Sequence, residues 1–230
     1  IGDPLALAFG LAALLLIERR DGWRWLALPA FGAALLCKES VATLPLVALL
    51  AGTTRHGAET APEPGLAGAG PAAGRWPVQG LVRAARDRVT LALFAVALTY
   101  IAYLAMADTM GSRQAGSEAA YANGWGGHVL GNALSYLGWT VNFAFPTVRG
   151  FTDARDPVVY GWALAAFALT LVGLAWAPLR RRGFGAACLA YVALLLPVLL
   201  LRSHTYHYYL ELPMLAAAWA QALVFDAIGT

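Results

Sequence analysis

The chain alternates long apolar runs with short polar ones, and the runs lack the periodicity of a one-sided helix or strand. Runs that are apolar on all sides are typical of helices in lipid, because only a backbone with internal hydrogen bonds crosses hydrocarbon. The pattern predicts an all-α, multi-pass transmembrane helical bundle of about seven spans. The apolar runs cover residues 4–17, 23–37, 40–51, 89–107, 158–177, 184–201 and 212–228, and a mixed run covers 128–147.

Two runs, 23–37 and 40–51, are shorter than the roughly 20 residues of a spanning helix. We interpret them as a hairpin whose tip, residues 37–40, reaches the outer face. Basic residues collect on the cytoplasmic side of membrane proteins, and only the hairpin places all three arginine clusters there. These clusters are Arg19, Arg20 and Arg24; Arg55, Arg75, Arg83, Arg86 and Arg88; and Arg180, Arg181 and Arg182.

The mixed run 128–147 is interpreted by the same argument, because each membrane crossing moves the following loop to the other side. If this run crossed the membrane, the last arginine cluster would face outward. We therefore expect one outer interfacial helix, or a re-entrant one, that ends at Pro146. The aromatic residues Trp125, Tyr136 and Trp139 would then anchor it at the interface.

The predicted organisation is a single transmembrane domain over residues 1–230. Residues 55–88 form a cytoplasmic linker, partly disordered because 57–74 is rich in Pro, Gly and Ala. Residues 108–157 form an outer loop that contains the interfacial helix. The chain starts at Ile1 without a signal peptide and stops directly after an apolar run, so we expect a fragment of a longer protein.

Composition agrees with a membrane protein. Hydrophobic residues make up 60% of the chain and charged residues 13%, with a mean hydropathy of +0.61, whereas a soluble domain carries about 25% charged residues. The formal net charge is +3, and no basic and aromatic stripe indicates nucleic-acid binding. Cys37 and Cys188 lie in apolar surroundings, which favours buried thiols over a disulfide framework or a metal site.

Lys38 and Glu39 form a charged pair between two apolar runs. A charge inside a membrane costs about 2.5–3.5 kcal/mol on insertion scales, so such a pair must be hydrated, paired or used. One interpretation is a helix end whose side chains extend to the interface. In the other, Lys38 binds an anionic headgroup, for which a lysine point charge is suited, and Glu39 orients that group or contacts a sugar hydroxyl.

A second polar cluster, residues 202–213, separates the last two apolar runs. An aromatic belt explains its three tyrosines, but not Arg202, His204, His207 and Glu211. His204 and His207 would share a helix face. Their spacing leaves a divalent metal open, although His-x-x-His alone does not establish one. Phosphate binding by Arg202 with imidazole support is the favoured interpretation.

Four carboxylates lie in or beside the expected outer loops: Asp3, Asp108, Asp153 and Asp156. Each is a candidate general base if an acceptor hydroxyl lies near it. Solvated loop side chains are the simpler interpretation. The catalytic residue therefore stays unassigned.

Residues 35–45 (LLCKESVATLP) resemble the hairpin of GT-C-type glycosyltransferases, in which a Lys-Glu pair is followed by apolar residues and a proline. The resemblance is greatest to bacterial relatives of the O-mannosyltransferases that carry tetratricopeptide repeats. Three further segments resemble that family in the same order. Residues 2–7 open the preceding helix, residues 130–146 resemble an outer amphipathic helix, and residues 206–213 resemble a tyrosine-rich segment closed by Leu-Pro.

The resemblance implies a GT-C-like fold and an inverting glycosyltransferase in a bacterial inner membrane. It would transfer a sugar from a polyprenyl-phosphate donor to a hydroxyl-bearing protein or glycan acceptor on the non-cytoplasmic face. Its partners would be the lipid-linked sugar, membrane lipid and the acceptor, without nucleic acid. Lys38 and Arg202 would bind the donor phosphate, and the donor pocket would contain Glu39, His204, His207, Tyr208 and Glu211.

The family's catalytic carboxylate lies in a first outer loop, which would precede Ile1. This chain is therefore expected to lack that residue, and Asp3 is not expected to replace it. No cofactor is established by the sequence, and a divalent metal is left open.

Two other functions fit the sequence. A secondary transporter or lipid flippase would need broken helices at corresponding positions of two halves, and only the Lys38–Glu39 segment suggests such a break. The other alternative is a non-enzymatic membrane assembly or anchoring subunit. The side of the membrane on which Lys38 and His204 lie discriminates among these functions.

Overall fold

The computed structural model describes residues 2–19, 21–59, 85–109, 124–141, 155–181, 183–201 and 207–229, and the regular elements in these ranges are all helical. The predicted all-α class is therefore confirmed. The α-helices are α1 (Gly2–Ile17), α2 (Ala27–Cys37), α3 (Leu44–Glu59), α5 (Arg88–Thr109), α6 (Gly127–Val141), α8 (Pro157–Ala175), α9 (Ala177–Arg181), α10 (Phe184–Leu199) and α11 (Pro213–Ile228). The 3-10 helices are η1 (Gly22–Leu26), η2 (Glu39–Thr43) and η3 (His207–Leu210).

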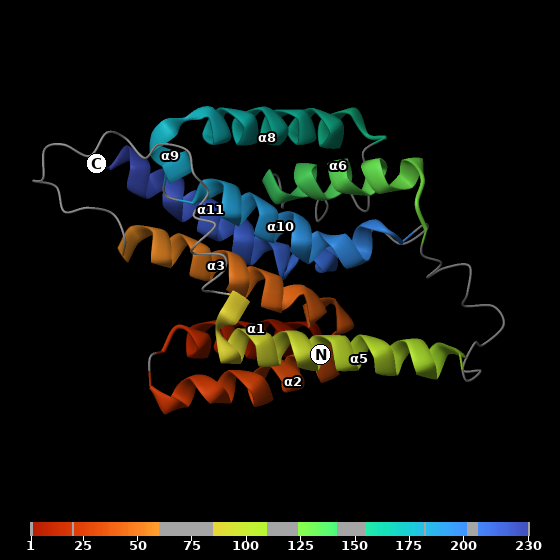
Figure 1. Cartoon of the computed structure of the whole chain (residues 1–230). Helices are drawn as coiled ribbons and strands as arrows, with labels where there is room; N and C mark the ends of the chain where they lie inside the picture. The colour runs from red at the N-terminus through yellow and green to blue at the C-terminus, as the bar shows by residue number, and fades with distance from the viewer. Residues whose placement is uncertain are drawn as a thin grey trace, which may run out of the picture.

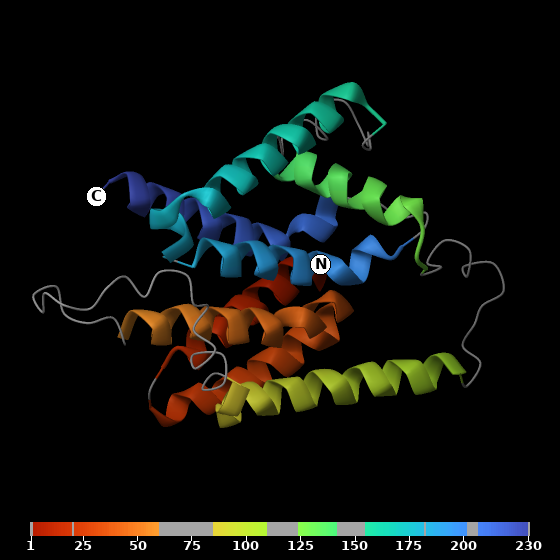
Figure 2. The same cartoon turned by 45° about the horizontal axis from the view of Figure 1, so that its top comes forward.

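The long helices run back and forth along one common direction (Figures 1 and 2). One end of the molecule holds η1, α9 and the start of α5, and we call it the arginine end. The opposite end, which we call the lysine end, holds η2, η3 and the starts of α6 and α8. Segments that are far apart in the sequence therefore meet at the lysine end.

The predicted break between the second and third apolar runs is present. α2 ends at Cys37, and Lys38 adopts an extended conformation with φ −161° and ψ 124°. The Lys38 N–H still donates to the Ala34 carbonyl at 2.9 Å, after which the chain turns through η2 and reverses direction into α3 (Figures 1 and 2). The two runs are therefore separate helices and not one long helix.

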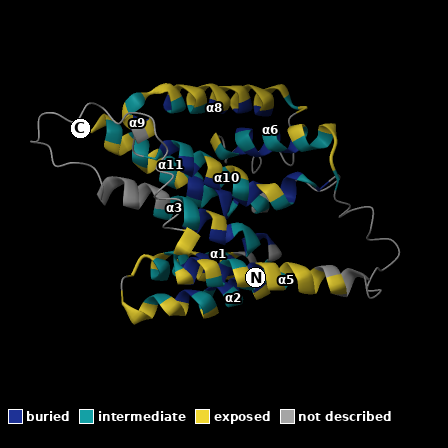
Figure 3. Cartoon of the chain, in the orientation of Figure 1, coloured by how far each residue is buried: buried dark blue, intermediate teal, exposed yellow. Residues whose placement is uncertain are grey.

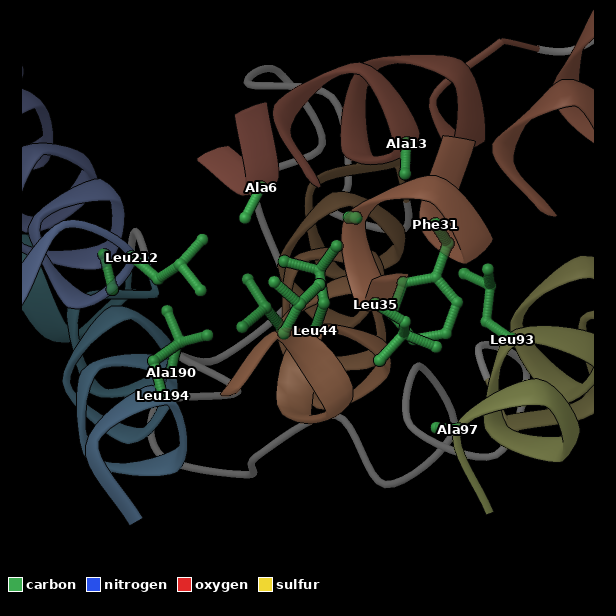
Figure 4. Packing of buried hydrophobic residues seen from close by; sticks show 14 residues of the cluster. Ala6, Ala13, Phe31, Leu35, Leu44, Leu93, Ala97, Ala190, Leu194 and Leu212 are labelled. Carbon is green, nitrogen blue, oxygen red and sulfur yellow. The ribbon is translucent and has the colours of Figure 1, made fainter. Parts of the chain in front are cut away.

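Two clusters of buried apolar side chains join the helices. The first, around Phe31, Leu44 and Leu194, brings side chains of α1, α2, α3, α5, α10 and α11 together (Figure 4). The second joins α6, α8, α10 and η3 around Trp139. Tyr191 of α10 packs against both clusters, which makes α10 the central helix of the bundle.

α8 buries its small side chains and exposes its large apolar ones, whereas a helix on the surface of a soluble protein buries its large apolar side chains. Its buried residues are Val159, Ala163, Ala166 and Gly173. Its large residues point outward, and Phe167 and Leu169 are 53% and 66% exposed (Figure 3). Large contiguous apolar surfaces are rare on soluble monomers. The outer face of α8 is therefore suited to an apolar environment.

One described helix, α8, is long and apolar enough to cross a membrane, with 19 residues and a mean hydropathy of 2.0. Only 22% of its apolar stretch is buried, whereas a core helix of a soluble protein is mostly buried. The other apolar helices found in the described ranges have 10–17 residues. At about 1.5 Å per residue they are shorter than the roughly 30 Å hydrocarbon core, so helix length does not show the expected seven spans.

The helix predicted in the mixed run is α6, and it packs along α8. Both helices start at the lysine end (Figures 1 and 2), which agrees with the re-entrant alternative for this segment. The expectation that Tyr136 and Trp139 anchor the helix at the interface is wrong, because they are 0% and 1% exposed. Only Trp125, 78% exposed, remains available as an anchor.

Two of the expected arginine clusters meet at the arginine end. The Arg24 Nη2 atom of η1 lies 2.8 Å from Asp87 Oδ1, directly before α5. The other carboxylate oxygen of Asp87 accepts hydrogen bonds from the Thr90 N–H at 3.0 Å and the Thr90 hydroxyl at 2.9 Å. Asp87 thus caps α5 and joins it to the turn between α1 and α2.

The linker 60–84 and residues 110–123 and 142–154 lie outside the described residues. The expected cytoplasmic linker over 55–88 and the outer loop over 108–157 therefore remain predictions.

Gly138 provides a test of the close packing between α6 and α8. A Cβ atom at this position would lie 2.5 Å from the Val159 carbonyl oxygen, so Gly138→Ala must push the helices apart. We expect a loss of about 1–3 kcal/mol, the usual cost of overpacking, seen as a lower unfolding temperature in detergent. Gly131→Ala, on the same helix but facing open space, is the matched control. It should leave stability equal or slightly higher, and an equal loss in both variants would contradict the packing.

Candidate functional site

The predicted site residues fall into three groups in the structure. The side chains of Lys38 and Glu211 are described and lie at the lysine end. The backbone, but not the side chain, is described for Glu39 in η2 and for His207 and Tyr208 in η3. Arg202 and His204 lie outside the described residues, so their predicted roles in phosphate binding remain predictions.

The structure brings the two polar clusters of the sequence together. The Lys38 Nζ atom lies 5.3 Å from the centre of the Tyr209 ring, within the range of a cation–π interaction. Tyr209 belongs to η3, which follows Lys38 by more than half of the chain. Lys38 and Tyr209, which belongs to the described part of the 202–213 segment, therefore lie at the same end of the molecule.

Sequence reasoning did not single out Tyr209. The tyrosine-rich run was recognised, but Tyr208 was the tyrosine placed in the donor pocket. The side chain of Tyr208 is outside the described residues, so its place in the donor pocket remains a prediction.

Buried leucines hold this site in place from both sides of Glu211. Leu210 is fully buried in the second apolar cluster. Leu212 is buried in the first cluster together with Leu35 and Leu44, which belong to the helices on either side of Lys38. The Lys38 turn and the Tyr209–Glu211 segment are therefore fixed against the same core.

Asn132 of α6 fixes the chain just before the 202–213 segment. Its side-chain amide donates to the carbonyl oxygens of Leu199 at 3.1 Å and Leu201 at 2.8 Å, and the Gly124 N–H donates to the Leu200 carbonyl at 3.0 Å. Carbonyls at a helix end need such partners in apolar surroundings. In the sequence Asn132 is only one polar residue of the mixed run 128–147, and nothing there indicates its partners.

An apolar groove of about 600 Å³ runs between α2 and α5. It is open on one side, where Leu36 is 85% exposed. Lys38 follows Leu36 by two residues, so the groove ends close to the lysine end. The groove is lined by Gly32, Leu35, Leu36, Ala95, Val96, Thr99, Tyr100 and Tyr103.

The candidate carboxylates and metal ligands are only partly visible. Asp156 accepts a hydrogen bond from the Val158 N–H at 2.8 Å and caps α8, which explains it as a structural residue. The side chains of Asp3, Asp108 and Asp153 lie outside the described part. Among the described residues, no three His, Cys, Asp or Glu side chains gather as metal ligands would.

Comparisons with models of protein families, with curated proteins and with solved structures gave no match. The resemblance to GT-C-type glycosyltransferases therefore stays a prediction, and function is argued below from the residues of the chain alone.

A double-mutant cycle tests the contact between the two polar clusters. Lys38→Met and Tyr209→Leu each remove the cation–π pair, so the second substitution should cost less when the first is present. We expect a coupling of about 0.5–2 kcal/mol in the free energy of unfolding. Two strictly additive effects would show that Lys38 and Tyr209 do not interact.

Proposed function

We propose that this chain is a multi-pass membrane domain that binds a polyprenyl-phosphate-linked sugar at its lysine end, as part of a GT-C-like glycosyltransferase. The observation that carries the proposal is the position of Lys38. Lys38 lies between the apolar helices α2 and α3, its ammonium group faces Tyr209, and Leu36, two residues earlier, lines an apolar groove. A lipid with a phosphate headgroup has the same combination of one anionic and one apolar part.

The outer surface supports several membrane crossings. Large apolar side chains are exposed on α8, α5, α10 and α1 alike, and the charged side chains that the structure describes lie toward the two ends. Helices of 16 residues can span when the bilayer thins or flanking residues extend to the interface. The positive-inside rule places the arginine end in the cytoplasm and the lysine end outside.

The proposed division of the site follows from chemistry. Lys38 would bind the phosphate as a point charge, with Arg202 as the second cation. Glu39, His204, His207, Tyr208 and Glu211 would surround the sugar. The polyprenyl chain would lie in the groove between α2 and α5, where it meets leucine and aromatic side chains.

In the proposed reaction, an acceptor hydroxyl attacks the anomeric carbon of the sugar from the face opposite the phosphate. The new bond joins the acceptor oxygen to the sugar, and the bond from the sugar to the phosphate oxygen breaks. The anomeric configuration is inverted. The lipid phosphate leaves with the electron pair, and Lys38 and Arg202 would stabilise its charge. The base that takes the acceptor proton is unassigned.

The groove and the lysine equally fit the alternative of a lipid flippase, which would bind the same headgroup without transferring the sugar. The two functions differ in their product. A transferase releases sugar-free polyprenyl phosphate, and a flippase moves the intact lipid to the other leaflet.

Binding of undecaprenyl phosphate to the full chain in nanodiscs tests the role of Lys38. We expect Lys38→Met to weaken this binding at least about tenfold, which corresponds to about 1.4 kcal/mol, since a buried phosphate without its cation is unfavourable. Arg180→Met, an exposed cation of α9 at the other end, is the control and should bind normally. Equal affinity of Lys38→Met and the unmodified chain would refute the proposed site.

The groove is tested by filling it. Ala95→Phe places a large side chain among the groove residues and should weaken undecaprenyl phosphate several-fold. A water-soluble prenyl phosphate of one isoprene unit should be unaffected, since only the long chain needs the groove. Ala102→Phe, on an exposed part of α5 outside the groove, is the matched control. If Ala102→Phe weakens the long-chain lipid as much as Ala95→Phe does, the chain lies elsewhere.

A further inference from the structure

The turn between α1 and α2, at the arginine end, carries a hollow that the proposed function does not use. The hollow has a volume of about 480 Å³, opens to the outside, and is lined by Asp21, Gly22, Trp23 and Leu26. These residues lie in or directly before η1, where the chain is exposed along most of its length (Figure 3). A ligand can therefore reach the walls of the hollow from outside the protein.

One group of each charge borders the hollow. The Asp21 carboxylate lines it, and the Arg19 guanidinium lies beside this carboxylate, with Nη2 3.1 Å from Oδ2 and Nε 3.4 Å from Oδ1. The Arg19 and Asp21 side chains are 58% and 47% exposed. The hydrogen bond from Arg19 lowers the pKa of the Asp21 carboxyl, so Asp21 is ionised at neutral pH. A ligand meets an anion and a cation side by side here.

Neither of these two groups has its bonding capacity filled by the other. A guanidinium has five N–H donors and a carboxylate about four acceptor sites, more than the contact between Arg19 and Asp21 uses. The neighbouring Arg24 instead turns to Asp87 beside α5, at 2.8 Å, and so fixes η1 on the bundle. One arginine thus holds the hollow in place, while another lies within reach of a ligand.

Apolar side chains surround this charged pair. Trp23, Trp25 and Leu26 are 63%, 47% and 44% exposed. Tryptophan is enriched where a membrane meets water, because its ring is apolar and its N–H group is polar. The positive-inside rule places this end of the molecule at the cytoplasmic surface. The hollow is therefore expected at the depth of the lipid headgroups.

We propose that this hollow binds the headgroup of a zwitterionic aminophospholipid, phosphatidylethanolamine. The ammonium group of the lipid donates to Asp21, its phosphate accepts from Arg19, and Trp23 and Leu26 contact its glycerol and the start of its acyl chains. A short ethylene group joins the two charges of the lipid, so a single headgroup can meet both members of an adjacent ion pair. The inference goes beyond the proposed function, because it needs the arginine end at a membrane surface but no polyprenyl phosphate at Lys38.

Other headgroups match the hollow less well. The nitrogen of phosphatidylcholine is fully methylated and has no N–H group to donate to Asp21. Phosphatidylglycerol has a phosphate but no cation, so the Asp21 carboxylate in the wall of the hollow would repel it. The carboxylate therefore determines which lipid is preferred, and Arg19 supports every lipid that carries a phosphate.

The test compares these three lipids with identical dioleoyl chains. Their binding to the full chain in detergent is measured by native mass spectrometry, which counts the lipids that each protein molecule retains. We expect the unmodified chain to bind phosphatidylethanolamine about three- to fivefold more tightly than phosphatidylcholine, which is within the range of an exposed ion pair.

Substitutions separate the two charges. Asp21→Asn should remove the preference for phosphatidylethanolamine and should bind phosphatidylglycerol at least as well as the unmodified chain. Arg19→Gln should weaken phosphatidylethanolamine and phosphatidylcholine alike and keep the preference. Asp226→Asn, an exposed carboxylate near the end of α11 and outside the hollow, is the matched control and should change nothing. The unfolding temperature, expected to be equal in all of these variants, shows that each is folded.

Three results would overturn this inference. They are equal affinity of the unmodified chain for phosphatidylethanolamine and phosphatidylcholine, an unchanged preference in Asp21→Asn, and tighter binding of phosphatidylglycerol than of both other lipids. Lys38→Met should keep the preference, and its loss there would place the headgroup at the lysine end instead. If Asp21 determines the preference but the chain does not bind undecaprenyl phosphate, the hollow is supported and the proposed function fails.

Discussion

Close approach of helix backbones at small residues is the interaction on which the rest of this structure depends. Gly138 of α6 faces the Val159 carbonyl, and Gly173 of α8 faces the Phe184 ring of α10, each too closely for an added Cβ atom. Where apolar surroundings cannot drive helices together, such contacts let van der Waals packing do so. Small residues are then needed inside the bundle, and the large apolar side chains are left to cover its outside.

This packing also creates the site. α6 lies close enough to α10 for Asn132 to bond the last carbonyls of that helix, which fixes where the following polar segment begins. On the other side, Leu212 packs with Leu35 and Leu44, and the helix break at Lys38 is held against Tyr209. A lysine that would be costly within hydrocarbon thus lies at the end of the bundle, directly after the helix α2 that lines one side of the apolar groove.

Much of the fold follows from the sequence. The apolar runs predicted where the helices lie, although α3 extends to Glu59, eight residues beyond its predicted run. The arginines predicted that the turn before α2 and the start of α5 share one end, where Arg24 pairs with Asp87. The break at Lys38 was visible as a charged pair between runs too short to span. These features depend on local composition and on charge, which a sequence displays directly.

The features that the sequence did not predict depend on which neighbouring residue a side chain contacts in the fold. Tyr136 and Trp139 were assigned to the interface because aromatic residues on a half-polar helix look alike whether they face lipid headgroups or another helix. The role of Asn132 was not predicted, since its partners are backbone carbonyls more than sixty residues away. The contact between Lys38 and Tyr209 likewise joins residues far apart in sequence and required the three-dimensional packing.

The sidedness of Lys38 tests the central claim most directly. Lys38 is the only lysine of the chain, so an amine reagent that does not cross membranes reports its position, with Lys38→Arg as the blank. Gly22→Cys, in a chain with Cys37 and Cys188 replaced by alanine, reports the arginine end. The account predicts that Lys38 reacts only from the non-cytoplasmic side and Cys at position 22 only from the cytoplasmic side. Reaction of both from the same side would contradict it.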